Sequence, residues 1–240
     1  HAVGAIAAGH RVGGSGHPRT LTCFSFYPNK NLASAEGGAV TTADAAIAER
    51  LRELRLHGLR SDAWDRYRSD RYRPALAGSA GYKANWTDLQ AAIALPQLAK
   101  LEGFLATREY LAERYDELLR DVDGVRVRPR GPRDLDWRHA LHLYQVEIAG
   151  PPGTRDRVLS RLLERGVGAA VHYIGLNRHP HYRRTLPARI PVSDWASDHL
   201  LTLPLHPAMS DADLIRVRDE LARAVHAELG CSDAAFRIAV

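Results

Sequence analysis

The stretch Cys23 to Thr42, CFSFYPNKNLASAEGGAVTT, contains Lys30, one of only three lysines in a chain with 33 Lys and Arg residues. The amine of a lysine can lose its proton and condense with an aldehyde, whereas an arginine effectively cannot. Lys30 follows an apolar, strand-like run and a proline, and it precedes a Glu-Gly-Gly turn. This placement predicts a lysine that forms a Schiff base.

The residues on both sides of Lys30 weigh against the simpler interpretation, which is a solvated lysine at a loop tip. The aromatic and apolar run at 23–27 is typical of a buried strand, and residues 39–41 predict a second strand. The hydroxyl of Ser25 could hydrogen-bond a phosphate beside the lysine. The two glycines of the Glu-Gly-Gly turn allow the backbone to turn tightly next to a cofactor.

The same stretch resembles the pyridoxal-phosphate lysine segment of the DegT/DnrJ/EryC1/StrS family of sugar aminotransferases. Further motifs resemble this family in the same order: HGLRSDAWDRY (57–67), GYKANWTDLQAAIALPQL (81–98), VHY (171–173) and LTLPLHPAMSD (201–211). Several ordered motifs are more specific than one lysine, and together they cover nearly the whole chain. The form GYK-x-N-x-TD is most similar to the branch that makes 4-amino-4-deoxyarabinose or similar amino sugars.

The resemblance implies an α/β fold, the fold-type I (aspartate aminotransferase-like) fold of pyridoxal-phosphate-dependent transferases. Residues 1–100 would form the C-terminal part of the large, cofactor-binding domain, residues 101–230 a small C-terminal α/β domain, and residues 231–240 a tail. The implied reaction transfers an amino group from glutamate or glutamine to a nucleotide-linked keto-sugar in amino-sugar biosynthesis. Because the family forms dimers with shared active sites, we expect a homodimer.

The resemblance also implies roles for individual residues. Lys30 would hold pyridoxal phosphate and move the proton, which requires a pKa lowered by burial or by nearby positive charge. Ser25 would bind the cofactor phosphate, and His1 would lie against the cofactor. Lys83 and Asn85 would reach the cofactor phosphate of the neighbouring subunit, but their segment predicts equally well a capping turn before the following helix.

Other positions are assigned through the same motifs. His172 and Tyr173 match the His-Tyr pair of the family, which tends to face the sugar-nucleotide end of the cleft. Glu36, beside the two glycines, predicts either a structural role in the turn or a contact with the substrate. Trp86 departs from the aliphatic residue that the resemblance leads us to expect, so the local packing is not predicted.

His1 matches the histidine of the family's Asp-Ala-Ala-His-Ala segment, so the aspartate would stand three residues before it. That carboxylate keeps the pyridine nitrogen protonated and makes the ring an electron sink. We therefore expect an N-terminally incomplete copy of the enzyme that cannot transaminate alone. The alternatives are a non-catalytic truncated remnant or interaction protein, and a sugar dehydratase of the same family, in which histidine replaces the equivalent of Lys30.

Composition places the chain among ordinary globular proteins, with 45% hydrophobic and 25% charged residues. No apolar run approaches the roughly 20 residues needed to span a membrane. Cys23 and Cys231 have no metal or redox spacing, so we expect a cytoplasmic protein.

The net charge of +5 comes from arginines interleaved with acidic residues, which disfavours nucleic-acid binding. The proline between His179 and His181 points these side chains apart, which disfavours a metal site.

Periodicity predicts helices and strands that alternate in α/β layers. We expect a helix over 43–56, an exposed loop over 60–80, and a long helix that begins near Thr87, is kinked by Pro96 and forms the hinge between domains. Beyond it we expect strands at Ala140–Ile148 and Gly168–Tyr173 and a helix at Thr154–Arg165. A final helix opens with Ser210-x-x-Asp213, close to a capping box, and carries one apolar face: Leu214, Val217, Leu221 and Val225.

Overall fold

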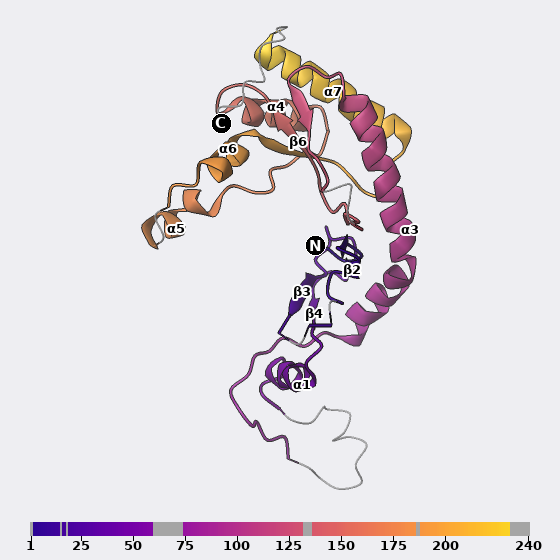
Figure 1. Cartoon of the computed structure of the whole chain (residues 1–240), viewed down its shortest axis with the longest axis vertical. Coiled ribbons are helices and arrows are strands. Elements are labelled where there is room, and N and C mark those ends of the chain that lie inside the picture. Colours follow the sequence, from indigo (N-terminus) through magenta and orange to yellow (C-terminus); the bar gives the residue numbers. More distant parts are fainter. Residues whose placement is uncertain are drawn as a thin grey trace. The chain divides into compact units, whose positions relative to one another are not determined.

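The computed structural model describes residues 2–14, 16–17, 19–59, 74–131, 136–185 and 188–230. The chain divides into two compact units (Figure 1). Unit 1 comprises His1–Gly103 and Gly131–Ala140, and unit 2 comprises Phe104–Arg130 and Leu141–Val240. The assignment of these units to a large and a small domain stays a prediction.

The described residues of unit 1 form two strand pairs, one helix and the first part of a second, longer helix. Strands β1 (Ile6–Ala7) and β2 (His10–Arg11) pair antiparallel, and so do β3 (Thr22–Ser25) and β4 (Gly38–Thr41). The strands predicted on both sides of Lys30 are therefore present, and Ser25 lies opposite Gly38. The prediction that the first of them is buried is wrong, because no residue of β3 is buried. Helix α1 (Ala45–Leu54) begins after Asp44, whose carboxylate accepts hydrogen bonds from two backbone N–H groups of the first turn at 2.8 and 3.0 Å.

Helix α3 (Asp88–Leu119), drawn in magenta in Figure 1, runs from unit 1 into unit 2. It begins with a capping box in which the N–H of Gln90 donates to Thr87 Oγ1 at 3.3 Å and the N–H of Thr87 donates to Gln90 Oε1 at 2.9 Å. The predicted helix start at Thr87 is confirmed. The helix continues without interruption through Pro96.

Unit 2 contains a three-stranded antiparallel sheet in the order β5 (Val125–Val127), β6 (Tyr144–Ile148) and β7 (Leu200–Leu203). Helix α4 (Thr154–Glu164) contacts both β7 and helix α7 (Asp211–Leu229). The other described helical segments of this unit are η1 (Leu176–Arg178), α5 (Pro180–Thr185) and α6 (Pro191–His199).

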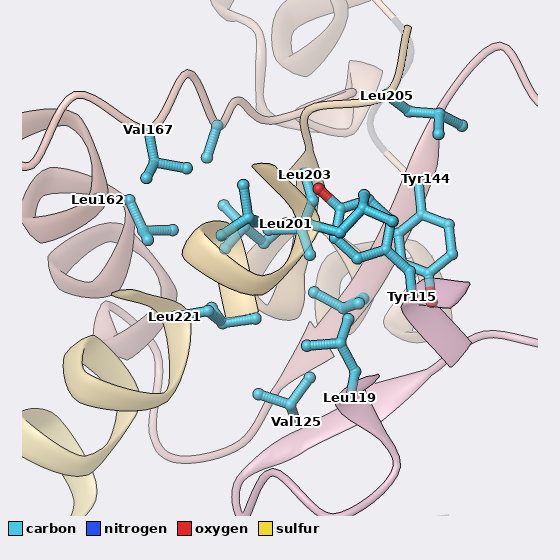
Figure 2. Packing of buried hydrophobic residues seen from close by; sticks show 14 of the residues in the cluster. Tyr115, Leu119, Val125, Tyr144, Leu162, Val167, Leu201, Leu203, Leu205 and Leu221 are labelled. Atoms are coloured by element: carbon cyan, nitrogen blue, oxygen red, sulfur yellow. The ribbon is translucent and has the colours of Figure 1, made fainter. Parts of the chain in front are cut away.

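The core of unit 2 is one cluster of buried apolar side chains from its sheet and helices. Figure 2 shows Leu162 of α4, Leu201 of β7 and Leu221 of α7 gathered in this cluster. The rings of Tyr115 and Tyr144 pack with their centroids 4.7 Å apart. The predicted apolar face of α7 is confirmed, because all of its residues are buried: Leu214, Val217, Leu221 and Val225.

Unit 1 has a much smaller core. Its described buried hydrophobic residues are Phe26, Leu32, Ala94, Leu101 and Ala140. No residue of α1 is buried, and apolar side chains in the first turns of α3 stay exposed. The conformation of unit 1 therefore depends strongly on polar contacts. Within the described ranges, no helix combines the length and apolar character that a membrane crossing needs.

The predicted strand at Gly168–Tyr173 is wrong. Only Ala170 pairs, in an isolated bridge with Thr202 of β7. The carbonyl of His172 instead accepts a hydrogen bond from the side-chain amide of Gln145 at 2.7 Å, so the segment does not continue as a strand along the sheet.

Other predicted bounds differ at their ends. The helix predicted over 43–56 is α1, and the strand predicted over Ala140–Ile148 is the shorter β6. Leu141 has a φ of 48°, which is outside the strand region and prevents an earlier start. Strands β5 and β7 were not predicted, and most of the loop predicted over 60–80 lies outside the described residues.

The capping box predicted for α7 is confirmed. The N–H of Ser210 donates to Asp213 Oδ2 at 2.8 Å, and the N–H of Asp213 donates to Ser210 Oγ at 3.3 Å. The hydrogen bonds from the backbone and the hydroxyl of Ser210 lower the pKa of Asp213.

Ser210→Ala should lower the free energy of unfolding by about 1 kcal/mol at neutral pH, because one N–H group of the first turn loses its acceptor. Because the folded-state pKa of Asp213 is lowered, its stabilising contribution is present above the ordinary aspartate pKa of about 3.9 and is lost as the pH falls through the lowered value. Chemical unfolding should therefore show a smaller difference between Ser210→Ala and wild type in acid. Ser160→Ala, which removes an exposed hydroxyl within α4, is the control, and an equal loss in both variants would contradict the prediction.

Candidate active site

The loop of residues 26–37, which we call the Lys30 loop, joins β3 to β4. The N–H of Phe26 donates to the carbonyl of Gly37 at 2.9 Å, and the N–H of Ser34 donates to the carbonyl of Phe26 at 2.8 Å. These hydrogen bonds extend the strand pairing and close the base of the loop. Lys30 lies between them, in the part of the loop that follows the predicted apolar strand.

Lys30 is partly exposed. Its backbone N–H donates to the carbonyl of Tyr27 at 2.9 Å, which closes a tight turn. Partial burial lowers the pKa of the Lys30 amine because the charged form loses hydration. Burial is the only cause of this shift, so no charged neighbour among the described residues contributes to it. A lowered pKa increases the fraction of neutral, nucleophilic amine at a given pH.

Gly37 and Gly38 are required by the packing at the end of the loop. Gly37 has a φ of +136°, and a Cβ atom there would lie 2.4 Å from Nε1 of Trp86. A Cβ atom on Gly38 would lie 2.4 Å from the carbonyl oxygen of Phe24. Both positions therefore exclude any side chain, which explains the Glu-Gly-Gly turn in physical terms.

Asn31, next to Lys30, is buried and was not predicted as a site residue. Its side-chain amide donates to the carbonyl of Ala140 at 2.5 Å, so it ties the loop to the segment 136–140 of the same unit. Its Oδ1 atom is buried and has no hydrogen-bond partner among the described residues. The signal in the sequence that could have indicated Asn31 is its position, because it is a polar residue between Lys30 and the apolar Leu32.

Two glutamines of α3 hold the second half of the Lys30 loop. Gln97 makes a two-way contact with Ala33, because its Nε2 donates to the carbonyl at 2.7 Å and its Oε1 accepts from the N–H at 3.2 Å. Gln90 Nε2 donates to the carbonyl of Glu36 at 2.9 Å. Residues seven apart share one face of a helix, so the sequence spacing places both side-chain amides on the same face of α3. Nothing in the sequence indicated that they would bind the backbone of the Lys30 loop.

Glu36 helps to hold the Lys30 loop through its backbone carbonyl. Its carbonyl oxygen accepts hydrogen bonds from the loop and from the α3 region, while its side chain is exposed. This arrangement favours the structural alternative of the two that the sequence leaves open.

Ser25 is the last residue of β3, at the start of the Lys30 loop. Its hydroxyl oxygen accepts a hydrogen bond from the N–H of Tyr27 at 3.4 Å, and its side chain is partly exposed. Ser25 thus directly precedes the loop that contains Lys30. The role of Ser25 in binding a phosphate stays a prediction.

Lys83 and Asn85 are exposed on the segment before α3. The segment is fixed by a bridge between Leu56 and Lys83, and by a hydrogen bond from the N–H of Ala84 to the carbonyl of Arg55 at 2.8 Å. The structure connects this segment to the Lys30 loop through Trp86, not through Lys83 or Asn85 themselves.

His172 and Tyr173 belong to unit 2. Nδ1 of His172 lies 3.0 Å from Oγ1 of Thr202, and its ring makes an edge-on contact with Tyr173, with centroids 4.8 Å apart. Tyr173 is 63% exposed. The structure brings these two residues together, and their place relative to Lys30 stays a prediction.

His1 lies outside the described residues, and so do residues 60–67 of the HGLRSDAWDRY motif. Their proposed roles stay predictions. Across the described ranges, no group of three or more His, Cys, Asp or Glu side chains is arranged to hold a metal ion.

A sequence model described as the DegT/DnrJ/EryC1/StrS aminotransferase family matches residues 1–222. The chain belongs to this family. The family expected from the Lys30 stretch is confirmed, and the matched segment contains every predicted site residue.

Individual proteins are similar to this chain over most of its length. MJ1066 of Methanocaldococcus jannaschii, itself uncharacterized, is 37% identical over 222 residues, which make up 90% of this chain and 56% of MJ1066. DesV of S. venezuelae is 29% identical, with a TM-score of 0.78 over 92% of this chain and 55% of DesV. Spr1654 of Streptococcus pneumoniae, assigned as a sugar aminotransferase and solved in its PMP form, is 25% identical, with a TM-score of 0.84 over 95% of this chain and 58% of Spr1654.

These likenesses confirm the predicted fold class, the α/β fold of fold-type I pyridoxal-phosphate-dependent transferases. The chain spans about half the length of the family members that it matches.

Gly37→Ala should lower the free energy of unfolding by about 1–3 kcal/mol, because the new methyl group meets the Trp86 ring at a backbone conformation that L-residues rarely adopt. Gly103→Ala is the matched control. It lies inside α3 with open space around its Cα, so the same substitution should stabilise by about 0.5–1 kcal/mol. Denaturant unfolding measures both, and a Gly37→Ala variant as stable as Gly103→Ala would contradict the packing described for the loop.

Proposed function

We propose that this chain forms the Lys30-bearing part of a pyridoxal-phosphate-dependent sugar aminotransferase. The observation that carries the proposal is the Lys30 loop, which holds a partly buried amine of lowered pKa in the stretch whose resemblance to the family's cofactor-lysine segment led us to expect this role. Family membership supports the reaction class, and the PMP form of Spr1654 supports the cofactor. Lys30 argues against the sugar dehydratase branch, for which the family resemblance implies histidine at this position.

The residues of the loop fit this chemistry. When bound, pyridoxal phosphate supplies the electron sink for the carbon that loses a proton. Lys30 would hold the cofactor by condensing with its aldehyde and releasing water. Once the amino donor displaces Lys30, its free amine could accept the proton and then return it; acceptance requires the neutral form, because an ammonium group has no lone pair. Partial burial favours that neutral form. Ser25, at the end of β3 directly before this loop, would offer its hydroxyl to the phosphate.

The proposed substrates are a nucleotide-linked keto-sugar and an amino donor, glutamate or glutamine. The net charge of +5 suits an anionic sugar nucleotide. In unit 2 the contact of His172 with Thr202 orients the imidazole, and the exposed ring of Tyr173 offers an aromatic surface beside it. These two residues are the proposed contacts with the sugar nucleotide.

A homodimer with a shared active site is part of the proposal. Lys83 and Asn85 would reach the cofactor phosphate of the partner subunit, and their exposure on the segment before α3 supports this role. The proposed compartment is the cytoplasm, which the free, exposed thiol of Cys23 suits.

Transamination is proposed to need polypeptide in addition to these 240 residues. The chain covers 55% of DesV and 58% of Spr1654. Unit 1 also exposes large apolar side chains on and just before α3, including Tyr82, Leu89 and Leu95, which are 73%, 80% and 64% exposed. Apolar surfaces of this kind are usually covered by other polypeptide. A non-catalytic remnant or interaction protein, the alternative function, would use the same surface but would not bind the cofactor.

Borohydride trapping tests the role of Lys30 in the natural polypeptide that contains these residues. Pyridoxal phosphate is added, the Schiff base is reduced, and the peptides are mapped by mass spectrometry, which is simple because these residues contain only three lysines. We expect the label on Lys30 in wild type and in the matched control Lys100→Ala. Lys30→Ala should lose the label and about 10²–10⁴-fold of the transaminase activity.

A label on Lys83 or Lys100 in place of Lys30 would contradict the proposed function. So would a Lys30→Ala variant with wild-type activity. The need for further polypeptide has its own test, because purified residues 1–240 that convert a keto-sugar nucleotide with glutamate would contradict it.

A further inference from the structure

Trp86 contacts the Lys30 loop at its first residue. The indole ring packs against the ring of the buried Phe26, with centroids 5.4 Å apart and an angle of 37° between the planes. Phe26 also carries both hydrogen bonds that close the base of the loop, through its N–H and its carbonyl. The indole therefore supports the point at which the loop leaves β3.

The same indole contacts the other end of the loop through its N–H. An indole nitrogen is a donor only, and here it lies 3.2 Å from Ser34 Oγ and 3.2 Å from the carbonyl oxygen of Glu36. Ser34 is fully buried, and its hydroxyl donates to the same carbonyl at 3.0 Å. The single N–H thus joins two acceptors that already contact one another.

Gly37 brings the backbone against the ring. A Cβ atom at this position would lie 2.4 Å from Nε1 of Trp86, so the indole occupies the space beside the Gly37 backbone. Trp86 therefore touches both Phe26 and Gly37, the two residues that the closing hydrogen bond joins. Lys30 lies in the segment that these contacts enclose.

We infer that Trp86 is a positioning residue for Lys30: its N–H fixes the 34–36 segment so that the loop presents the amine to the cofactor. This inference rests on the proposed function of Lys30. The aliphatic residue expected at this position from the family resemblance could pack against Phe26, but it has no N–H to donate. The donor is therefore what Trp86 supplies beyond the aliphatic residue that the resemblance led us to expect.

One variant separates the N–H from the ring, and a second removes both. Trp86→Phe keeps an aromatic ring against Phe26 and removes the donor, and Trp86→Leu removes ring and donor and leaves the aliphatic side chain that the resemblance led us to expect. Trp137→Phe is the matched control, because it makes the same change at a 45% exposed indole in unit 1. Gln90 and Gln97 remain in every variant, so the loop stays attached to α3.

The first measurement, hydrogen–deuterium exchange, needs no cofactor. Loss of one hydrogen bond should speed exchange of the amides within residues 31–37 about fivefold in Trp86→Phe, and not in Trp137→Phe. Peptides from α7 should exchange at the wild-type rate in both variants, which shows that unit 2 is unaffected.

The second measurement is the fraction of Lys30 trapped by borohydride at limiting pyridoxal phosphate. We expect about a fivefold lower yield in Trp86→Phe and Trp86→Leu, and the wild-type yield in Trp137→Phe. Faster exchange with an unchanged yield would make Trp86 merely structural and would overturn the inference, as would an unchanged exchange rate. Failure of wild type itself to label Lys30 would instead overturn the proposed function, and the inference with it.

Discussion

The backbone oxygen of Glu36 accepts hydrogen bonds from three side chains: Ser34 Oγ at 3.0 Å, Trp86 Nε1 at 3.2 Å and Gln90 Nε2 at 2.9 Å. A carbonyl oxygen has two lone pairs, so three donors exceed its usual capacity, and one of them, the indole N–H, is shared with Ser34 Oγ at 3.2 Å. One donor belongs to the Lys30 loop, and the other two lie at the start of α3, about fifty residues away in sequence. We call these three hydrogen bonds at the Glu36 carbonyl the junction. The conformation of the loop, and with it the position of Lys30, depends on this junction.

The junction matters because unit 1 has few buried apolar side chains. In unit 2, residues such as Leu162 and Leu221 are fully buried, and each contributes about 1.5–3 kcal/mol through removal from water. A single hydrogen bond contributes about 1 kcal/mol, which is small against the core of unit 2 but not against that of unit 1. The steric requirement for Gly37 acts at the same place. Changes around the Lys30 loop should therefore affect the site before they affect the fold of unit 2.

The sequence predicted what local chemistry determines. The helix start at Thr87 and the capping box at Ser210 are made by residues three apart, so both could be recognised without knowledge of the fold. Features that need distant partners were not predicted. The segment around Ala170 forms one bridge instead of a strand, and Trp86 looked like an unexplained departure because its acceptors, Ser34 and Glu36, lie about fifty residues away.

The central claim is that the loop holds Lys30 as a partly buried amine of lowered pKa. The pH dependence of its acylation by a small reagent, followed residue by residue with mass spectrometry, tests this claim most directly. The reference is an unstructured peptide of residues 27–33, whose lysine should titrate near its ordinary pKa of about 10.4. Because only the neutral amine reacts, Lys30 in the folded protein should reach half of its maximal rate at a lower pH than the peptide. A midpoint equal to that of the peptide, or higher, would contradict the account.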